Sequence, residues 1–519
     1  MKVEAAWLPV AAALLGLVFS AGVERFIKPR PFPRRPRGAW EAHAGLWCAG
    51  YGLIVLVLGR PGCALAAASA GLVALALVNN AKMRNLREPF IFQDHDYFPG
   101  AIRHPRLFLP FLGWKNFFMA AAFFSAAAAG LYYESPPIRR FAFNGQLGGI
   151  LIVLGAAVFL LRSAARRDPP VSFNPQRDVQ ALGLLAGAWA YHRAERHPPN
   201  LSSPFDGAGM LNPQAKPHLV AVQHESFFDP RRLYNGIRPD ILAAFDAMRG
   251  ASSGYGLMEA PAWGANTVRT EFAFLTGVNE EGLGVHRFNP YREILRGRRV
   301  SSLPQFLKSL GYGTIAIHPY QARYFSRDRV FRRFGFDEFL DIRSFAGARR
   351  SGPYVADAEV GKKIIRVLSR ANGPTFVFAI TMEGHAPFSP ARMRPSDVEE
   401  FYLAPPPPGC EELTVYLRHL RNTDEMLRSL STALTALGVP AELCCFGDHV
   451  PIMPEVYKIL GAPKGDVPYL FWSGRQRPAP EFMDSAKADN QGRCQGGETR
   501  LGAHALASSW LRAAWGIRE

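Results

Sequence analysis

Long apolar stretches fill the first third of the chain, whereas charged residues are spread through the rest. Five stretches stand out: Trp7–Val23, Leu46–Leu58, Cys63–Val78, Phe117–Tyr132 and Gly148–Leu161. A transmembrane helix needs about 20 mostly apolar residues, and each stretch approaches that length once tolerable flanking residues are included. The first stretch lacks a basic start and a small-residue cleavage site, which favours an uncleaved span over a signal peptide. The pattern predicts a multi-span α-helical membrane domain over residues 1–165, with about five spans.

From His218 onward, short apolar runs alternate with helix-like segments. The runs typical of buried strands are His218–Gln223, Thr314–His318, Thr375–Thr381, Leu443–Phe446 and Tyr469–Trp472. The clearest helical segments are Ser302–Leu310, Ala358–Ala371 and Leu413–Leu437. This alternation predicts an α/β domain with a mainly parallel sheet between helices. We expect this domain over residues 217–480, followed by a C-terminal extension with a helix over 481–519.

Between these two parts, residues 166–216 are rich in Pro, Arg and Asn and contain one apolar stretch, Ala181–Tyr191. That stretch is too short to cross a bilayer, so it favours an interfacial or packing helix. The segment is therefore predicted to be a linker between the membrane domain and the α/β domain.

Composition narrows the class of partner. Of the 519 residues, 48% are hydrophobic and 20% charged, and the net charge is +17, with much of the excess in the first third. Next to apolar spans, such basic residues indicate helix flanks or anionic lipid rather than nucleic acid. No zinc-finger spacing and no basic-aromatic repeat supports a nucleic-acid partner.

Cysteine usage does not decide the compartment. The six cysteines are Cys48, Cys63, Cys410, Cys444, Cys445 and Cys494. Because neighbouring strand residues point to opposite faces, Cys444 and Cys445 are predicted to be buried thiols rather than a disulfide. Pairing of Cys410 with Cys494 stays open.

Basic residues gather in three connections of the membrane domain. They are Arg25, Lys28, Arg30, Arg34, Arg35 and Arg37; Lys82, Arg84, Arg87, Arg103 and Arg106; and Arg162, Arg166 and Arg167. If all five segments cross, the positive-inside rule places these regions and the α/β domain in the cytoplasm. One miscounted span would reverse that assignment, so the side of the membrane stays open.

Two predicted strands end in groups that bind metals. Glu225 follows the first strand, and Asp448 with His449 follows the strand that ends at Gly447. Ligand sites of α/β sheets form at the carboxyl ends of their strands. Carboxylate and imidazole groups suit Zn²⁺ or Mn²⁺, although a lone loop acid is more often a helix cap. The adjacent Asp448 and His449 favour a metal site, whereas Glu225 taken alone favours a helix cap or a satisfied loop acid.

A third segment, Gly264–Gly277, leads from a Gly- and Asn-bearing loop into an amphipathic helix that begins near Thr267. A hydroxyl there lies in the positive field of free backbone N–H groups, which favours phosphate and an ionised oxygen. Thr and Asn are also ordinary N-caps, so the segment alone does not establish catalysis.

Three further candidates follow other predicted strands: His318, Arg327 and His385. A guanidinium suits phosphate, but an isolated Arg is usually a solvated charge, and an isolated His is usually structural. These residues carry weight only together with the metal site.

In this order, the segments resemble the lipoteichoic acid synthase family. That family includes phosphoglycerol transferases acting on periplasmic glucans, within the alkaline phosphatase/sulfatase superfamily. The resemblance rests on Glu225, Asn-Thr267-x-x-x-Glu271-Phe, the Arg327 region, Gly384-His385-x-Pro-Phe and Gly-Asp448-His449. Phe325 departs from the Trp that lipoteichoic acid synthases carry two residues before that Arg. No Cys/Ser-x-Pro-x-Arg segment occurs, which argues against sulfate-ester hydrolysis.

The resemblance implies one divalent metal, most commonly Mn²⁺ with Mg²⁺ or Zn²⁺ as alternatives, held by Glu225, Thr267, Asp448 and His449. Thr267 would be the nucleophile, chosen over Thr270 because it lies four residues before the Glu-Phe pair. Substrate contacts would come from Arg327, His385 and His318.

The implied activity is transfer of phosphoglycerol from phosphatidylglycerol to a glycan or glycerophosphate-type acceptor, through a threonine-linked intermediate. The family works outside the cytoplasmic membrane, which conflicts with the distribution of basic residues. Two alternatives remain: a phosphoethanolamine transferase or phosphodiesterase on the same scaffold, and a non-catalytic membrane protein with a degenerate domain.

Overall fold

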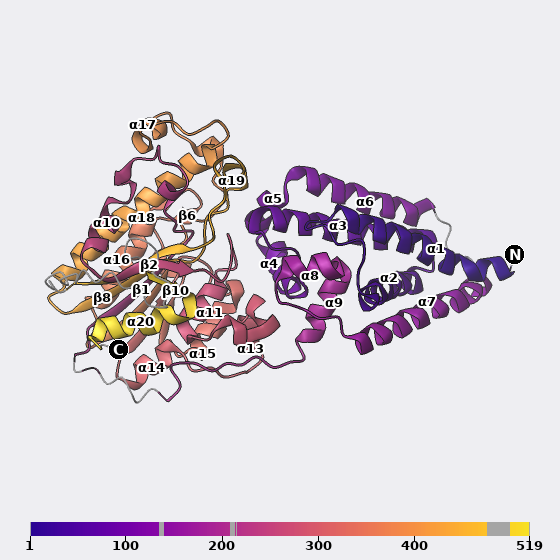
Figure 1. Cartoon of the computed structure of the whole chain (residues 1–519), viewed down its shortest axis with the longest axis horizontal. Helices are drawn as coiled ribbons and strands as arrows, with labels where there is room; N and C mark the ends of the chain where they lie inside the picture. Colours follow the sequence, from indigo (N-terminus) through magenta and orange to yellow (C-terminus); the bar gives the residue numbers. More distant parts are fainter. Residues whose placement is uncertain (1, 134–139, 208–212, 214, 475–498, 518–519) are drawn as a thin grey trace. The chain divides into compact units, whose positions relative to one another are not determined.

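The computed structural model describes residues 2–133, 140–207, 213, 215–474 and 499–517. The chain divides into two compact units, Met1–Pro198 and Pro199–Glu519 (Figure 1). We call them the helical unit and the sheet unit and describe each by itself.

The helical unit is built from long apolar helices. They are α1 (Lys2–Val23), α2 (Arg37–Leu58), α3 (Pro61–Leu86), α6 (Trp114–Tyr133) and α7 (Arg140–Arg167). Within the described residues, 4 helices are long and apolar enough to cross a membrane. The count rises to 5 if α5 (Pro105–Leu112) and α6, bent by 94°, form one broken span. Each of the five predicted stretches lies within one of these helices, and the expected multi-span helical domain is confirmed with four to five apolar helices.

The three basic connections lie at one end of the helical unit. The backbone N–H of Lys28, after α1, donates to Asn80 near the end of α3 at 2.7 Å. Arg167, the last residue of α7, pairs with Glu41 near the start of α2, with 3.0 Å between Nε and Oε2. The basic connections therefore share one side of the unit. This is the arrangement expected if two spans separate each basic connection from the next.

Two short helices occupy the predicted linker: α8 (Pro175–Leu182) and α9 (Leu184–Ala194). The α9 helix packs against α2 and buries Ala186 and Tyr191. The apolar stretch expected at Ala181–Tyr191 thus contributes to the packing of the helical unit.

The sheet unit contains an eight-stranded mixed sheet in the order β10-β2-β9-β8-β1-β7-β3-β4. Its strands are β1 (His218–His224), β2 (Ser252–Glu259), β3 (Gly313–Ile317), β4 (Glu338–Leu340), β7 (Thr375–Ile380), β8 (Ala441–Gly447), β9 (Val467–Ser473) and β10 (Thr499–Gly502). Five neighbouring strands, β8-β1-β7-β3-β4, run parallel, and β9 is antiparallel to both β8 and β2. All five predicted strands form, and the mainly parallel sheet is confirmed.

Helices cover both faces of this sheet, with α16 and α18 on one side and α11, α14, α15 and α20 on the other (Figure 1). The helices of the sheet unit are α10 (Ala243–Gly250), α11 (Val268–Thr276), α12 (Glu280–Leu283), α13 (Tyr291–Leu295), α14 (Leu303–Ser309), α15 (Arg327–Arg333), α16 (Asp357–Leu368), α17 (Asp397–Phe401), α18 (Glu411–Ala436), α19 (Pro454–Leu460) and α20 (Ala503–Trp515). Burial from both sides explains why every residue of β1, β7 and β8 is buried.

Cys444 and Cys445 are buried free thiols, as predicted, because β8 lies in the middle of the sheet. Cys410 is also buried, and its suggested partner Cys494 lies outside the described residues.

Candidate metal centre

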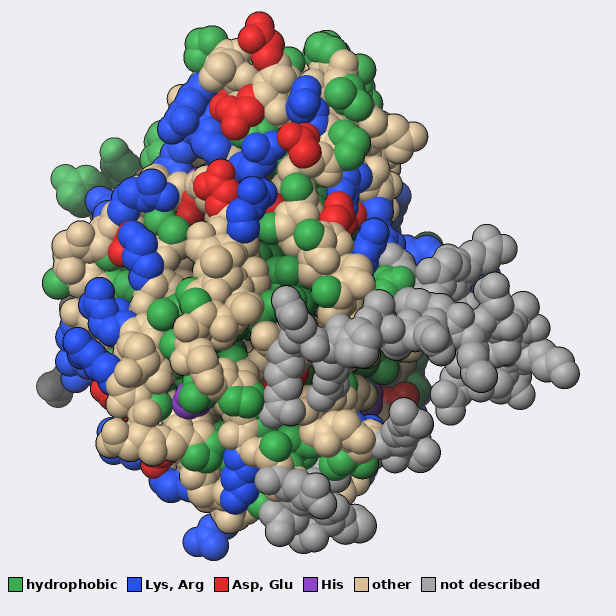
Figure 2. Space-filling model, turned by 90° about the vertical axis from the view of Figure 1, so that its left-hand side faces the viewer, with side chains coloured by type: hydrophobic (Ala, Val, Ile, Leu, Met, Phe, Trp, Pro, Cys, Tyr) green, Lys and Arg blue, Asp and Glu red, His purple; other side chains and the backbone are tan. Residues whose placement is uncertain are grey.

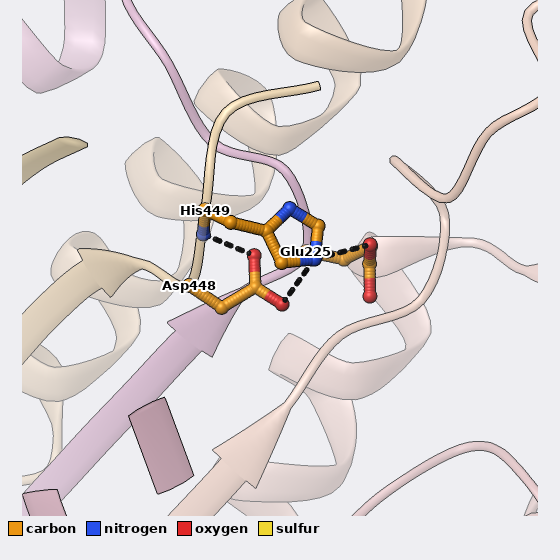
Figure 3. A group of neighbouring side chains, drawn as sticks. All are labelled: Glu225, Asp448 and His449. Carbon is orange, nitrogen blue, oxygen red and sulfur yellow. Dashed lines mark hydrogen bonds and ion pairs between the residues drawn. The ribbon is translucent and has the colours of Figure 1, made fainter. Parts of the chain in front are cut away.

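Three ionisable side chains meet where β1 and β8 end. Glu225 directly follows β1, and Asp448 and His449 directly follow β8, its parallel neighbour. One ligand atom from each residue lies within 4.8 Å of those from the other two, and all three residues are buried. Figure 3 shows the three side chains turned toward one another. The structure thus brings together three of the four predicted metal ligands as one cluster.

Hydrogen bonds fix which atoms face the centre of this cluster. Asp448 Oδ1 accepts the backbone N–H groups of Ser226 and His449, both at 2.8 Å. Its other oxygen, Oδ2, is buried without a hydrogen-bond donor among the described residues and lies 3.3 Å from His449 Nε2. On the other side, Glu225 Oε1 lies 3.7 Å from the same nitrogen (Figure 3).

The tautomer of His449 follows from its second ring nitrogen. Nδ1 lies 3.1 Å from the carbonyl oxygen of Val450, which can only accept, so Nδ1 carries the hydrogen. In the neutral ring Nε2 then presents a lone pair to both carboxylates. Three lone-pair atoms converge on one buried point, an arrangement that a cation stabilises.

The electrostatics of Glu225 agree with that reading. Burial raises the pKa of Glu225 well above its usual range, and the nearby Asp448 carboxylate raises it further. His449 acts in the opposite direction but does not offset the rise. Two oxygen donors and one imidazole nitrogen therefore fit a borderline divalent cation such as Mn²⁺ or Zn²⁺.

The backbone around the cluster is closely packed, which explains two glycines in the motifs. A Cβ at Gly384 would lie 2.4 Å from the carbonyl oxygen of Glu225. A Cβ at Gly447 would lie 2.2 Å from the carbonyl oxygen of Phe227. Both glycines let other strands approach the loop after β1, where Ser226 adopts φ 55°. Strain of this kind concentrates at functional sites.

Thr267 lies at the start of α11, as predicted, and its hydroxyl makes no capping bond to that helix. Instead Thr267 Oγ1 accepts Nε2 of Gln223 at 2.7 Å and lies 3.4 Å from Glu271 Oε1. Gln223 precedes Glu225 by two residues on β1, so the hydroxyl is held beside the end of that strand. The hydroxyl of Thr270 donates to the Asp448 carbonyl at 2.9 Å, which gives Thr270 a structural role instead.

Arg327 is buried at the start of α15 and pairs with Glu271 through Nε and Nη2, with Nε at 2.9 Å. The Tyr291 hydroxyl donates to the same carboxylate at 2.6 Å. The positive charge of Arg327 lowers the pKa values of Glu225 and His318, although burial has the largest effect on both. Arg327 therefore lies within electrostatic range of the cluster, positioned by Glu271.

Of the two predicted histidines, His318 is buried and His385 is partly buried, and desolvation lowers the pKa of each. His385 Nδ1 lies 2.6 Å from the Ala386 carbonyl oxygen, and His318 Nδ1 lies 3.3 Å from that of Ile380. By the carbonyl argument used above, Nδ1 carries the hydrogen in both rings. Each neutral ring thus presents an unprotonated Nε2, which can accept a proton.

Two residues that shape the site escaped the sequence analysis. Gln223 donates to the Thr267 hydroxyl. The sequence could have indicated it, because residues two apart along a strand point to the same face and Gln223 lies two residues before Glu225. The Tyr416 hydroxyl on α18 binds the carbonyls of Ser226 and Phe228 at 2.9 and 3.0 Å. No local pattern reveals that contact, because 188 or more residues separate the partners.

Comparison with known proteins places the sheet unit in a family. Residues 217–517 match the family model described as sulfatase. A putative cyclic beta-1,2-glucan modification protein of Rhizobium meliloti is 28% identical over 51% of this chain and 43% of its own length. The capsular polysaccharide biosynthesis protein RkpI of the same organism is 24% identical over 78% of this chain and 77% of its own. The match thus spans less than half of the first relative but most of the second.

One solved structure resembles both units together. The lipooligosaccharide phosphoethanolamine transferase A (EptA) of Neisseria meningitidis, an integral membrane protein, aligns over 98% of this chain and 95% of its own. The TM-score is 0.56 at 14% sequence identity, so the likeness concerns the fold alone. The sulfatase match and the glucan-modification relative confirm the resemblance drawn from the motifs.

Proposed function

Since the chain belongs to the sulfatase family, we propose that it is a membrane-anchored, metal-dependent transferase of phosphoglycerol. The donor is phosphatidylglycerol, and the acceptor is a glycan or a glycerophosphate-type polymer of the cell envelope. The observation that carries the proposal is the Thr267 hydroxyl, which is not used to cap its helix and is bonded to Gln223, two residues before Glu225 of the buried metal-ligating cluster.

Glu225, Asp448, His449 and Thr267 are the residues that would hold the metal, with Mn²⁺ as the expected ion. When bound, a divalent cation lowers the pKa of a coordinated hydroxyl and offsets negative charge on phosphoryl oxygens. Gln223 orients the Thr267 oxygen by donating to it, which leaves an oxygen lone pair for attack. The start of α11 adds backbone N–H groups that favour the phosphate.

The reaction has two displacements at phosphorus. The Thr267 oxygen attacks the lipid phosphodiester, loses its proton, and the bond from phosphorus to the diacylglycerol oxygen breaks. Diacylglycerol leaves with a proton, and phosphoglycerol is bonded to Thr267. An acceptor hydroxyl then attacks phosphorus, loses its proton, and the bond to Thr267 breaks, which restores the threonine.

Arg327, His385 and His318 would bind and assist the substrate. Arg327 donates to Glu271 through Nε and Nη2. Its third nitrogen, Nη1, makes neither of these bonds and would donate to a phosphoryl oxygen of the substrate. Nε2 of His385 or His318 would take the proton of the acceptor hydroxyl and return one to the leaving group.

A lipid donor explains the helical unit, because anchoring keeps the enzyme at the surface where its substrate lies. We place the sheet unit outside the cytoplasmic membrane, where envelope polymers occur. Labelling of single cysteines by a membrane-impermeant reagent in intact cells tests this placement. An engineered cysteine at exposed Asp240 should react without lysis, and reaction only after lysis would contradict it.

The decisive experiment offers the purified full-length protein Mn²⁺ and phosphatidylglycerol labelled in its head group. The wild type should release diacylglycerol and leave label on a peptide that contains Thr267. Thr267→Ala should lower the release on the order of 10³-fold, whereas Thr267→Ser, which keeps a hydroxyl, should retain measurable activity. Release by Thr267→Ala at the wild-type rate would refute the threonine intermediate.

The same assay separates the competing functions. Preference for labelled phosphatidylethanolamine would favour a phosphoethanolamine transferase, the activity named for the structurally similar EptA. Free glycerol phosphate in the presence of acceptor would indicate a phosphodiesterase. Absence of bound divalent metal and of diacylglycerol release would favour a non-catalytic protein.

A further inference from the structure

An arginine-lined cavity lies near the C-terminal end of α15, away from the metal-ligating cluster. Its volume is about 620 Å³, and its lining includes Arg298, Arg299, Arg333, Ser301, Gln305 and Phe334. The residues come from the α13–α14 connection, from α14 and from α15, which are neighbours in Figure 1. A cavity of this size admits a sugar or a sugar phosphate.

Three arginines and one acid, Asp206, are the charged residues that line the cavity. The arginines are Arg298 and Arg299, in the connection before α14, and Arg333 at the end of α15. Arg296 and Arg298 share one carboxylate, Glu293, at 2.8 Å each, so that acid offsets only part of their charge. On the face drawn in Figure 2, basic side chains lie among acidic ones.

Two of the lining arginines are available to a ligand. Arg299 is exposed and forms no ion pair among the described residues. Arg298 pairs through Nε, which leaves its terminal nitrogens, and 46% of its side chain is exposed. Arg333 is committed in part, because its Nη1 donates to the carbonyl of Ile294 and so joins α15 to α13.

Aromatic packing connects the cavity to the candidate site. Phe334, in the cavity wall, packs edge-on against Tyr291 with ring centroids 6.0 Å apart. Tyr291 donates to Glu271, which pairs with Arg327 at the other end of α15. Seven helical residues span about 9 Å from first to last, so Arg333 in the cavity wall lies about that far along α15 from Arg327.

We propose that this cavity binds an anionic segment of the acceptor polymer, through phosphate or carboxylate groups held by Arg298 and Arg299. The inference deepens the proposed function, on which it rests, by naming the class of acceptor: a negatively charged glycan or glycerophosphate chain rather than a neutral one. Arginine suits this role, because its planar fork binds both oxygens of such a group. Ser301 and Gln305 add neutral hydrogen-bonding groups for sugar hydroxyls.

A binding experiment tests the cavity without requiring catalysis. Full-length protein is titrated with a fluorescent dextran sulfate oligosaccharide and with neutral dextran of the same length. The wild type should bind the sulfated probe and not the neutral one. Arg298→Gln and Arg299→Gln should each weaken binding about tenfold, since each removes a charge-assisted contact. Arg366→Gln, at an exposed position on α16, is the matched control and should bind like the wild type.

Kinetics then separate this proposal from the proposed function. With labelled phosphatidylglycerol and an anionic acceptor, Arg299→Gln should raise the acceptor KM about tenfold and leave diacylglycerol release without acceptor unchanged. Unaltered probe binding by both variants, or equal binding of neutral dextran, would overturn the cavity proposal. Absence of diacylglycerol release by the wild type would instead refute the proposed function while leaving the binding result to stand.

Discussion

Glu24 in the helical unit and the Glu225–Asp448 pair in the sheet unit are buried carboxylates with opposite surroundings. Glu24 has no exposed surface, yet it accepts the backbone N–H groups of Leu184 and Leu185 at 2.9 and 3.2 Å. It also pairs with Arg35 and lies 3.2 Å from His43 Nδ1. Two backbone donors and the Arg35 guanidinium thus compensate this acid.

The carboxylates at the ends of β1 and β8 are compensated only in part. Asp448 Oδ1 accepts two backbone N–H groups and Glu225 Oε1 accepts the Ser226 hydroxyl, but among the described residues no Arg or Lys pairs with either acid. Asp448 Oδ2 has no hydrogen-bond donor among the described residues, and the nearest imidazole presents a lone pair. A buried charge that the protein's own donors and counter-charges compensate is a structural feature. A buried charge without such compensation indicates that a ligand binds there. The comparison distinguishes a packing cluster from a functional one, although the two have similar compositions.

The largest test of this comparison is Asp448→Asn. The substitution keeps the shape, removes one charge from an uncompensated pair and removes a metal-ligating oxygen. Changes around a metal ligand typically cost 10- to 100-fold, so loss of the ligand itself should lower diacylglycerol release by about 100-fold or more. Metal content measured by mass spectrometry should fall with it.

The stability of this variant gives the sharper result. Without metal, Asp448→Asn should unfold at or above the wild-type temperature, because it relieves repulsion between buried acids. A thermal midpoint several degrees lower in the metal-free protein would mean that Asp448 is compensated after all.

Glu24→Gln should show the reverse behaviour. It leaves the buried Arg35 guanidinium without its counter-charge, and breaking such a pair costs about 3–5 kcal/mol. The thermal midpoint of the helical unit, followed by fluorescence in detergent, should fall by at least about 6 °C. Arg30→Gln, at an exposed position in the same connection, is the control and should unfold like the wild type. Unchanged stability of Glu24→Gln would remove the basis of the comparison.

The sequence predicted the parts of the molecule that repeat a simple pattern. Apolar runs of helical length and buried strands revealed the five helices and β1, β3, β7, β8 and β9. The β2 strand, Ser252–Glu259, was missed because its serines and glycines and its partly exposed positions hide the apolar pattern of a buried strand.

For the site, strand ends and a helix start drew attention to Glu225, Thr267, Asp448 and His449, and the family resemblance supplied their expected roles. Spacing did not reveal the ion pair between Arg327 and Glu271. Arg327 was predicted as a substrate contact, whereas Glu271 served only to locate Thr267 four residues earlier. Such pairings depend on how distant elements pack, and no local periodicity encodes them.

A third buried acidic site, the pair Asp357 and Glu383, lies between the two extremes and gives the smallest predicted effect. The Asp357 backbone N–H and the Asn422 amide donate to Glu383, at 2.8 and 2.5 Å. Burial would raise the pKa of Glu383, but bonds from His419 and Asn422 lower it. Burial and the Glu383 charge raise the pKa of Asp357 above its ordinary value of 3.8. The pair therefore holds one proton, on Asp357, at neutral pH.

This shared proton makes stability depend on pH in a defined direction. Unfolded Asp357 loses its proton above about pH 4, whereas the folded residue retains it until the raised pKa is reached. Unfolding then releases a proton, so the contribution of Asp357 to stability falls as pH rises through that window, by at most about 1.4 kcal/mol per pH unit. Asp357→Asn should remove this slope from thermal midpoints measured between pH 5 and 7. Asp240→Asn, at an exposed position, should retain it. Equal slopes in wild type and Asp357→Asn would show that this pair, like Glu24, is compensated by the chain without a bound proton.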